Sequence, residues 1–402
     1  MKNIVLILTI VLLICFNVQA FDTNTAVTDV QNKIAIESTE ENTAEDIENG
    51  NDKEQINQFY DYITNMKTEN ELLKDVDVKL YVKDFLKTGE GGISFKKILG
   101  AIMSYGIKEL KASLKLLMLL VIISIICTLL TNLQRAFSSE QLSNIAYFAC
   151  YSLIIIIMSK SFYIGVDIAK SAISQMTGFM VALIPVLITL VASVGGFVEA
   201  AVMDPVIIGA ITVSSNLFMY IIIPVISMSF VLQFVNNLSL DYKIDKLTKL
   251  LNQGALWTQG IIMTIFIGVI TIRGITSKTI DQVTAKTAKF AVDNFVPIVG
   301  KSLSDAISTV AGYSVLLKNA LSSLGLIVII AMLLFPIVKL IIMIVLYKLT
   351  AALIEPISDG RLVNCINSAG DSLILIMSCL ICVSIMFFIM ISIVASAGRV
   401  MI

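Results

Sequence analysis

The sequence contains no histidine, and this absence excludes several kinds of chemistry at once. Ser-His-Asp and Cys-His catalysis, histidine proton relays and ordinary zinc sites all depend on an imidazole ring. Charged residues are scarce at 15%, and 29 basic residues are balanced by 30 acidic ones. Without a basic excess, the composition does not indicate a nucleic acid as partner. We therefore expect a non-enzymatic protein without a metal or other cofactor.

The six cysteines do not form the pattern of a disulfide framework. Cys379 and Cys382 make a CxxC motif, but it lies inside the apolar run LILIMSCLICVSIMFFIM. On a helix, this spacing places two small side chains on one face. We interpret the pair as packing residues, with redox or metal chemistry as the minor alternative.

Long apolar runs are what the sequence has in abundance, with 57% hydrophobic residues. Such runs of about 20 residues predict membrane-spanning helices. We expect an all-α polytopic membrane protein with about seven transmembrane helices, within a range of six to eight. The expected spans are about 116–133, 146–166, 176–194, 206–235, 254–272, 326–347 and 372–396. The fourth is long, and it is tilted, bent at Pro224, or made of two half-spans.

The N-terminus has the pattern of a secretory signal peptide over residues 1–20, with cleavage expected after Ala20. An uncleaved anchor helix is the alternative. Residues 21–58 carry ten acidic residues and only two lysines, which predicts a disordered extracytoplasmic segment. Residues 59–113 are amphipathic and predict a short helical extracytoplasmic region, and residues 114–168 then supply two transmembrane helices. Orientation in the membrane depends on this exported N-terminus.

Four of the six prolines indicate an internal duplication of the membrane region. Two pairs have the same separation of 39 residues and are offset from each other by 112: Pro185 with Pro224, and Pro297 with Pro336. We predict two repeat units, residues 169–276 and 277–398. If each unit crosses the membrane an odd number of times, the copies have opposite orientations, as in many transporters. Chance alignment of apolar sequence is the alternative.

Two polar segments inside the membrane region have more than one interpretation. Residues 285–325 are only half apolar, and they fit a re-entrant hairpin that lines a wet cavity or an amphipathic hairpin at the interface. Residues 240–251 carry leucines on one face and lysines on the other. That pattern fits an interfacial helix or a helix packed on the protein surface.

Lys339 is the most unusual charge, because it lies near the middle of the apolar run 326–347. A charge at this depth is costly and is retained either in a structural pair or along a polar path. The pair would be with a carboxylate or a helix C-terminus. Lys318 and Asp305 lie in the half-polar segment and are candidates for a cavity wall. With the offset of 112, Ser227 of the first repeat aligns with Lys339 of the second.

Several segments, taken in their order along the chain, resemble the stage III sporulation protein AE family of endospore-forming bacteria. They are LKTGEGGISFKKIL, LLTNLQRAF, FMVALIPVLITLVASVGG, NFVPIVGKSLSDAISTVAGYSVLLKNALSSLGL and TAALIEPISDG. The resemblance covers about residues 80–398, and the stretch from Pro297 through Asn319 is its most specific part. The long acidic tract at 21–58 is not expected to be shared.

The resemblance implies a polytopic protein of the mother-cell membrane that surrounds the forespore. It would belong to a multiprotein channel or feeding-tube apparatus that sustains forespore development, with other membrane proteins of that complex as partners. The family brings no catalytic residues. Its matching positions become structural or pathway candidates: Pro297, Gly300, Asp305, Gly312, Lys318, Asn319, Pro336 and Pro356. Lys339, Ser227, Pro185 and Pro224 join them from the repeat.

Three hypotheses follow for the function. The first is a non-enzymatic membrane component of the sporulation channel. The second is a secondary transporter for a small solute, built from inverted repeats. The third is a scaffold that only recruits partners. Self-association is left open, and nucleic acid is not expected as a partner.

Overall fold

The computed structural model describes residues 59, 62–64, 81–82, 85, 95–136, 140–193, 197–238, 244–295 and 300–397. Within these ranges every regular element is a helix, which confirms the all-α prediction. The elements are α5 (Phe95–Ala136), α6 (Glu140–Ser193), α7 (Phe197–Leu217), the π-helical turn η1 (Phe218–Ile222), α8 (Ile223–Leu238), α9 (Asp245–Phe295), α10 (Gly300–Ile354) and α11 (Gly360–Ser396).

Six segments of the described chain are long and apolar enough to cross a membrane, within the expected range of six to eight. They are Ile102–Leu130, Tyr151–Ser193, Pro205–Asn236, Asp245–Arg273, Ser314–Ile354 and Gly360–Ser396. In a bilayer, a helix satisfies every backbone hydrogen bond within the segment itself, so apolar runs of this length form helices there. The protein is therefore a polytopic helical membrane protein.

The count is six and not seven because α6 merges two of the predicted spans. The predicted spans 146–166 and 176–194 left the polar stretch 167–175 between them, but its sequence, DIAKSAISQ, contains neither glycine nor proline. Polar residues alone do not end a helix, and α6 continues for 54 residues. At 1.5 Å per residue it is roughly 81 Å long, more than twice the hydrocarbon thickness of about 30 Å.

The predicted long fourth span consists of α7, η1 and α8 in unbroken succession. Pro224 is the second residue of α8, and Ile223 alone separates it from the π-helical turn. A proline has no backbone N–H and cannot donate to the carbonyl four residues earlier. The chain adapts by widening the preceding turn, where the N–H of Ile223 donates to the carbonyl of Phe218, five residues back. Pro185 and Pro336 lie inside α6 and α10, which continue through them.

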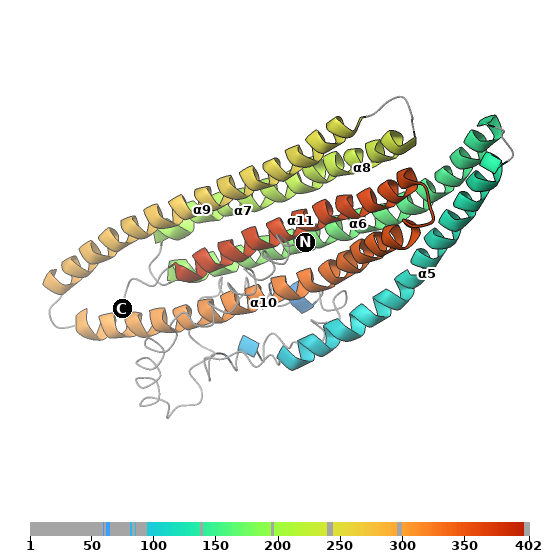
Figure 1. Cartoon of the computed structure of the whole chain (residues 1–402). Helices are drawn as coiled ribbons and strands as arrows, with labels where there is room; N and C mark the ends of the chain where they lie inside the picture. Colours follow the sequence, from blue (N-terminus) through green and yellow to red (C-terminus); the bar gives the residue numbers. More distant parts are fainter. Residues whose placement is uncertain are drawn as a thin grey trace.

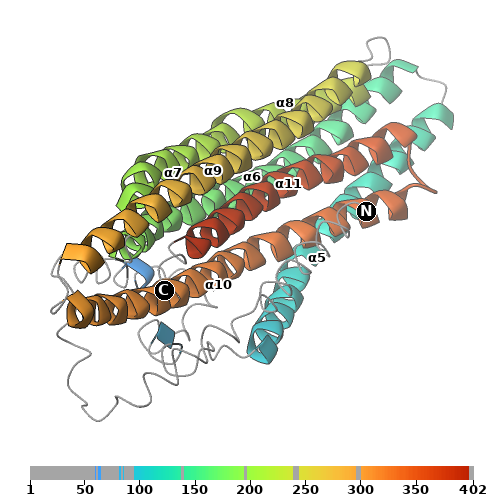
Figure 2. The same cartoon turned by 90° about the vertical axis from the view of Figure 1, so that its left-hand side faces the viewer.

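The helices form an elongated bundle with α6 and α11 at its centre (Figures 1 and 2). Helix α10 packs on both central helices, and α5 packs on α10 and α6. Helix α9 packs against α7, α8 and α11. In the apolar 18-residue window of each helix, 67% of α11 is buried, against 28% of α5 and of α10 and 22% of α9. Because α5 packs on one side of the bundle and α9 on the other (Figures 1 and 2), these two helices are its edges, and their outward faces contact the surroundings.

The two predicted repeats run in the same direction, which shows that the inverted-repeat interpretation is wrong. The end of α8 and the start of α9 lie at the same end of the bundle as the turn between α10 and α11 (Figures 1 and 2). From that end, α9 crosses the bundle and α10 crosses it back, so the hairpin of α10 and α11 points the same way as the hairpin of α8 and α9. The odd number of crossings that inversion needs is not present, because the stretch 277–295 continues α9 and is not a span of its own.

The half-polar segment 285–325 forms the end of α9 and the beginning of α10. These two helix ends extend past the neighbouring ends of α6, α7 and α11 (Figure 1). The backbone therefore continues two long helices and does not form a separate re-entrant element. Whether a wet cavity or an interface surrounds this segment stays a prediction, and Pro297 lies outside the described residues.

The predicted extracytoplasmic region contacts the bundle. Phe59 is buried, and its ring lies 5.9 Å from that of Phe179 on α6. Tyr81 is buried against α10, where its hydroxyl and that of Ser323 share a hydrogen bond of 3.1 Å. Burial raises the pKa of the Tyr81 phenol above its ordinary value, although the hydrogen bond to Ser323 lowers it. Segments 1–20 and 21–58 lie outside the described residues.

Helix α5 also crosses the predicted boundary at residues 113 and 114 without a break. The sequence assigned its first half to an extracytoplasmic region because that half carries several lysines. In the structure this half packs against the apolar middle of α10, as the contacts described next show. The boundary between domains and the side of the membrane on which it lies stay predictions.

Candidate functional site

Lys339 forms an ion pair between α10 and α5. Its Nζ lies 3.6 Å from Oε1 of Glu109, and the two side chains are 30% and 18% exposed. Opposite charges attract more strongly at a poorly hydrated position than in water, and the pair avoids leaving either charge alone. The lysine in the middle of the apolar run thus has a carboxylate partner. Its contribution to a polar path stays a prediction.

Aromatic and glycine contacts hold α5 in register beside this pair. The rings of Tyr105 and Phe335 are 4.5 Å apart between centroids. A Cβ added at Gly106 would lie 3.8 Å from Cγ1 of Val338, so the glycine permits ordinary van der Waals contact between the helices. Both contacts place the first half of α5 level with the residues around Lys339.

The sequence did not identify Glu109 because its neighbours Lys108 and Lys111 made the segment look like a solvated face. The position of Glu109 around the helix could have identified it as a buried residue. Glu109 shares a face with Tyr105 and Gly106, four and three residues earlier, whereas the lysines lie on another face. A carboxylate on the aromatic and glycine face indicates a buried partner.

Lys318 is fully buried at the other end of the α10 span. Its amine donates a hydrogen bond to the carbonyl of Ala397, directly after the end of α11. Backbone carbonyls are without helical partners at a helix C-terminus, and the helix dipole favours a cation there. Lys318 and Lys339 are 21 residues apart along one helix, or roughly 32 Å, so they do not share one site.

Ser227 lies on α8 and donates a hydrogen bond to the carbonyl of Ile223 at 2.9 Å. Helix α8 packs on α9 and α11, whereas Lys339 pairs with α5. The structure thus does not bring Ser227 and Lys339 together through any contact that it shows. Asp305 and Gly300 lie in the first turns of α10, and their side chains are outside the described residues.

A buried amide, Gln259 on α9, links α9 to the CxxC motif of α11. Its Nε2 donates to Sγ of Cys379 at 3.2 Å, and its Oε1 accepts from the hydroxyl of Ser378 at 2.9 Å. The thiol of Cys382 approaches the same oxygen at 3.8 Å. Both cysteines are free, and no group of metal-ligating side chains occurs among the described residues. The motif is a polar contact between helices, which sequence reasoning missed because Gln259 lies on another segment.

A second polar cluster lies next to the turn between α10 and α11. Nζ of Lys348 is 2.5 Å from a carboxylate oxygen of Asp371 and 2.8 Å from the side-chain oxygen of Asn367. Lys348 is half-buried and Asp371 is exposed, so water screens this pair. We interpret the cluster as a polar contact that holds α10 and α11 together near the turn between them.

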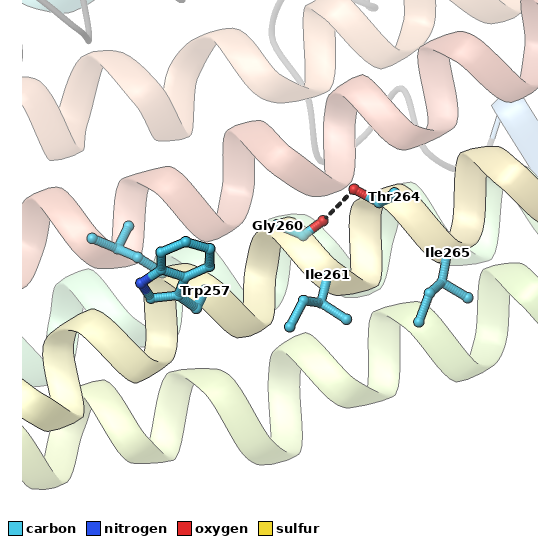
Figure 3. A pocket seen from close by; sticks show the side chains of 6 residues that line it. Trp257, Gly260, Ile261, Thr264 and Ile265 are labelled. Carbon is cyan, nitrogen blue, oxygen red and sulfur yellow. Dashed lines mark hydrogen bonds between the residues drawn. The ribbon is translucent and has the colours of Figure 1, made fainter.

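The outer face of α9 has a shallow hollow, shown in Figure 3. Its lining comes entirely from this one helix: Leu256, Trp257, Gly260, Ile261, Thr264 and Ile265. Thr264 donates a hydrogen bond to the carbonyl of Gly260 at 2.8 Å, so its hydroxyl is already satisfied. An open, apolar hollow without converging polar groups suits lipid and does not have the features of a solute site.

Comparisons with known proteins agree on one relationship. The family model for stage III sporulation protein AE matches residues 76–398. The chain is also similar to the stage III sporulation protein AE of Bacillus subtilis (strain 168), with 37% identity over 311 residues. That alignment covers 77% of this chain and 78% of the relative. No solved structure matches the chain.

Proposed function

The chain belongs to the stage III sporulation protein AE family, and from this premise we propose that it is a multi-pass membrane component of the channel apparatus between mother cell and forespore. A role in sporulation follows from the family. The observation that carries the proposal is the extent of the match, because residues 76–398 include all the helices from α5 to α11. The complete membrane bundle is thus the unit that the family shares.

The proposed location is the mother-cell membrane around the forespore, with the N-terminal region in the space between the two membranes. The six apolar helices support a membrane location. The signal-peptide pattern at residues 1–20 supports the orientation. We propose a non-enzymatic role, supported by the absence of histidine from the whole sequence.

The proposed partners are other membrane proteins of the same apparatus. A component of a multiprotein channel needs surfaces that are left open by its own fold. Helices α5 and α9 supply two such edges on opposite sides of the bundle, and most of the apolar 18-residue window of each is unburied. Self-association through one of these edges stays within the proposal.

No observation favours the alternative of a self-sufficient secondary transporter. Such proteins hold their substrate between repeats near the middle of the membrane, often at broken helices. In this protein the hairpin of α8 and α9 and the hairpin of α10 and α11 run in the same direction. The hollow in Figure 3 faces outward from a single helix. We therefore do not propose this function.

The test is genetic and uses compartment-specific expression. The gene is deleted in its endospore-forming host and restored from a promoter active only in the mother cell or only in the forespore. We expect heat-resistant spore counts to fall by several orders of magnitude on deletion and to recover with mother-cell expression alone. A late forespore reporter should follow the same pattern. Recovery from forespore expression alone would contradict the proposed location, and undiminished spore counts after deletion would contradict the function.

A further inference from the structure

Three lysines form a row along the outer face of α5. Lys108, Lys111 and Lys115 are spaced three and four residues apart, which places them on one strip of the helix. All three are exposed, and none takes part in an ion pair within the part of the chain that the structure describes. Glu109, the one acidic residue of segment 102–130, points instead to Lys339.

The contacts between α5 and α10 fix the depth of this row. Tyr105 lies beside Phe335, and Glu109 lies beside Lys339, so both contacts join residues that are 230 positions apart. The two helices therefore run in the same direction at this register. Extending it places the three lysines level with residues 338, 341 and 345. These positions all fall inside the apolar run 326–347, which has one charge.

The neighbouring strip of α5 has the opposite character at the same depth. Each lysine directly follows an apolar residue, and these three are also exposed: Ile107 by 51%, Leu110 by 42% and Leu114 by 38%. Consecutive residues of a helix are about 100° apart, so the two strips face different surroundings. The apolar strip suits lipid chains. The lysine strip does not, because charged side chains at this depth face protein or water.

We propose that the lysine face of α5, formed by Lys108, Lys111 and Lys115, lines a water-filled path through the membrane that attracts small anions such as phosphate or carboxylates. The row supplies three positive charges without described acidic partners, and it runs along α5 for two turns of the helix. On the side of α5 that faces α10, Glu109 is neutralised by Lys339 of α10, so this carboxylate leaves the charge of the row uncompensated. We assign the opposite wall of the path to a partner protein of the proposed apparatus. This inference rests on the proposed function of a channel component.

The test measures the access of water to single cysteines in a variant without the six native cysteines. Lys108→Cys, Lys111→Cys and Lys115→Cys are compared with Ile107→Cys, Leu110→Cys and Leu114→Cys in host membrane vesicles, opened and resealed so that both sides meet the reagent. The probe is an anionic methanethiosulfonate, which reacts with ionised thiols in water, and unreacted thiols are counted by a maleimide gel shift. We expect each lysine position to react about ten times faster or more than its apolar neighbour, because ionised thiols form in water and are suppressed in hydrocarbon.

Two patterns would overturn the path. Equally slow reaction at all six positions means that lipid or protein covers the whole face. Equally fast reaction means that this half of α5 lies outside the bilayer. Because all six side chains are exposed, the variants are expected to accumulate normally, and the amount of protein is checked in each case.

The preference for anions is tested separately at Lys111→Cys. Each labelling rate is divided by the rate of the same reagent with a free thiol in solution. The normalised rate of an anionic thiosulfonate should be several times that of a cationic one of similar size, and adding Lys108→Gln and Lys115→Gln should remove that preference. Equal normalised rates before the additional substitutions would refute the anion preference. The labelling assay does not depend on sporulation. If the labelling pattern fails while the wild-type gene still restores sporulation, the proposed path is refuted and the proposed function stands. A wild-type spore count after deletion removes the function itself.

Discussion

At the scale of single residues, the structure turns the isolated Lys339 into half of an ion pair with Glu109. Removing one partner leaves the other charge uncompensated in a poorly hydrated contact. Removing both leaves neither charge. The pair is also the main polar link between α5 and α10 among the described residues, so its loss is expected to loosen the edge helix before it affects the central helices.

We predict that Glu109→Leu and Lys339→Leu each destabilise the protein, while the double variant loses less than the sum of the two. We expect a coupling free energy of about 1–2 kcal/mol, within the usual range for residues in contact. Midpoints of thermal unfolding in mild detergent give the comparison. Additive losses would show that the two charges do not interact.

One of these variants, Lys339→Leu, also tests function. We expect Lys339→Leu to leave the protein inserted and abundant but to reduce the count of heat-resistant spores. A normal count with normal abundance would assign Lys339 a purely structural role. Immunoblots of membrane fractions provide the abundance control.

Gln259 is a second residue whose role only the tertiary contacts show. Gln259→Leu removes the hydrogen bonds with Ser378 and Cys379, and we expect a loss of about 0.5–1.5 kcal/mol, because hydrogen bonds between transmembrane helices are individually modest. Thr258→Leu is a suitable control, because Thr258 bonds only to the carbonyl of Gly254 on its own helix. A larger effect at Thr258 than at Gln259 would contradict the assignment.

At the scale of helices, close packing around α6 depends on two glycines. A Cβ at Gly165 would lie 2.6 Å from Cδ2 of Leu373, and one at Gly325 would lie 2.5 Å from Cδ2 of Leu183. Both leucines are fully buried and have little room to move. Small residues at such contacts let membrane helices approach closely.

We predict that Gly165→Val and Gly325→Val each destabilise the bundle by roughly 1–3 kcal/mol through overpacking. Gly260→Val is the matched control, because a Cβ at Gly260 meets no atom within 4 Å. The midpoints of thermal unfolding should be lower for Gly165→Val and Gly325→Val than for Gly260→Val. Similar midpoints for all three would show that the helices separate easily at these contacts.

At the scale of the whole molecule, the common direction of the two hairpins determines the topology. The end of α8, the start of α9 and the turn at 355–359 lie at one end of the bundle, and the end of α9 and the start of α10 lie at the other (Figure 1). Helices of more than 50 residues also extend beyond the bilayer. Parts of α6, α9 and α10 therefore lie in the aqueous or interfacial space outside the hydrocarbon core.

We predict that cysteines at Lys246 and Ile357 react with an impermeant maleimide from the same side of the membrane. Lys246 is exposed near the start of α9, and Ile357 is 54% exposed in the turn between α10 and α11. A cysteine at Lys301, at the start of α10, should react from the opposite side. Labelling of Lys246 and Ile357 from different sides would restore the inverted arrangement.

The sequence by itself determined the class of this protein and its family. Apolar runs of this length form helices in a bilayer, and the quoted segments in their order along the chain carried the resemblance that the comparisons then showed. It also located Lys339 as an exceptional charge. Each of these conclusions depends on composition or local pattern, which a linear chain displays directly.

Only the tertiary structure decided which residues meet. The partner of Lys339 lies 230 residues away, the partners of Gln259 lie about 120 residues away, and the direction of the hairpins depends on α6 and α9 continuing as single helices. Local pattern does not contain these facts, because a polar stretch can be a loop or a helix and a helix face can meet any neighbour. Packing of whole helices, through glycine contacts, aromatic pairs and paired charges, selects one arrangement.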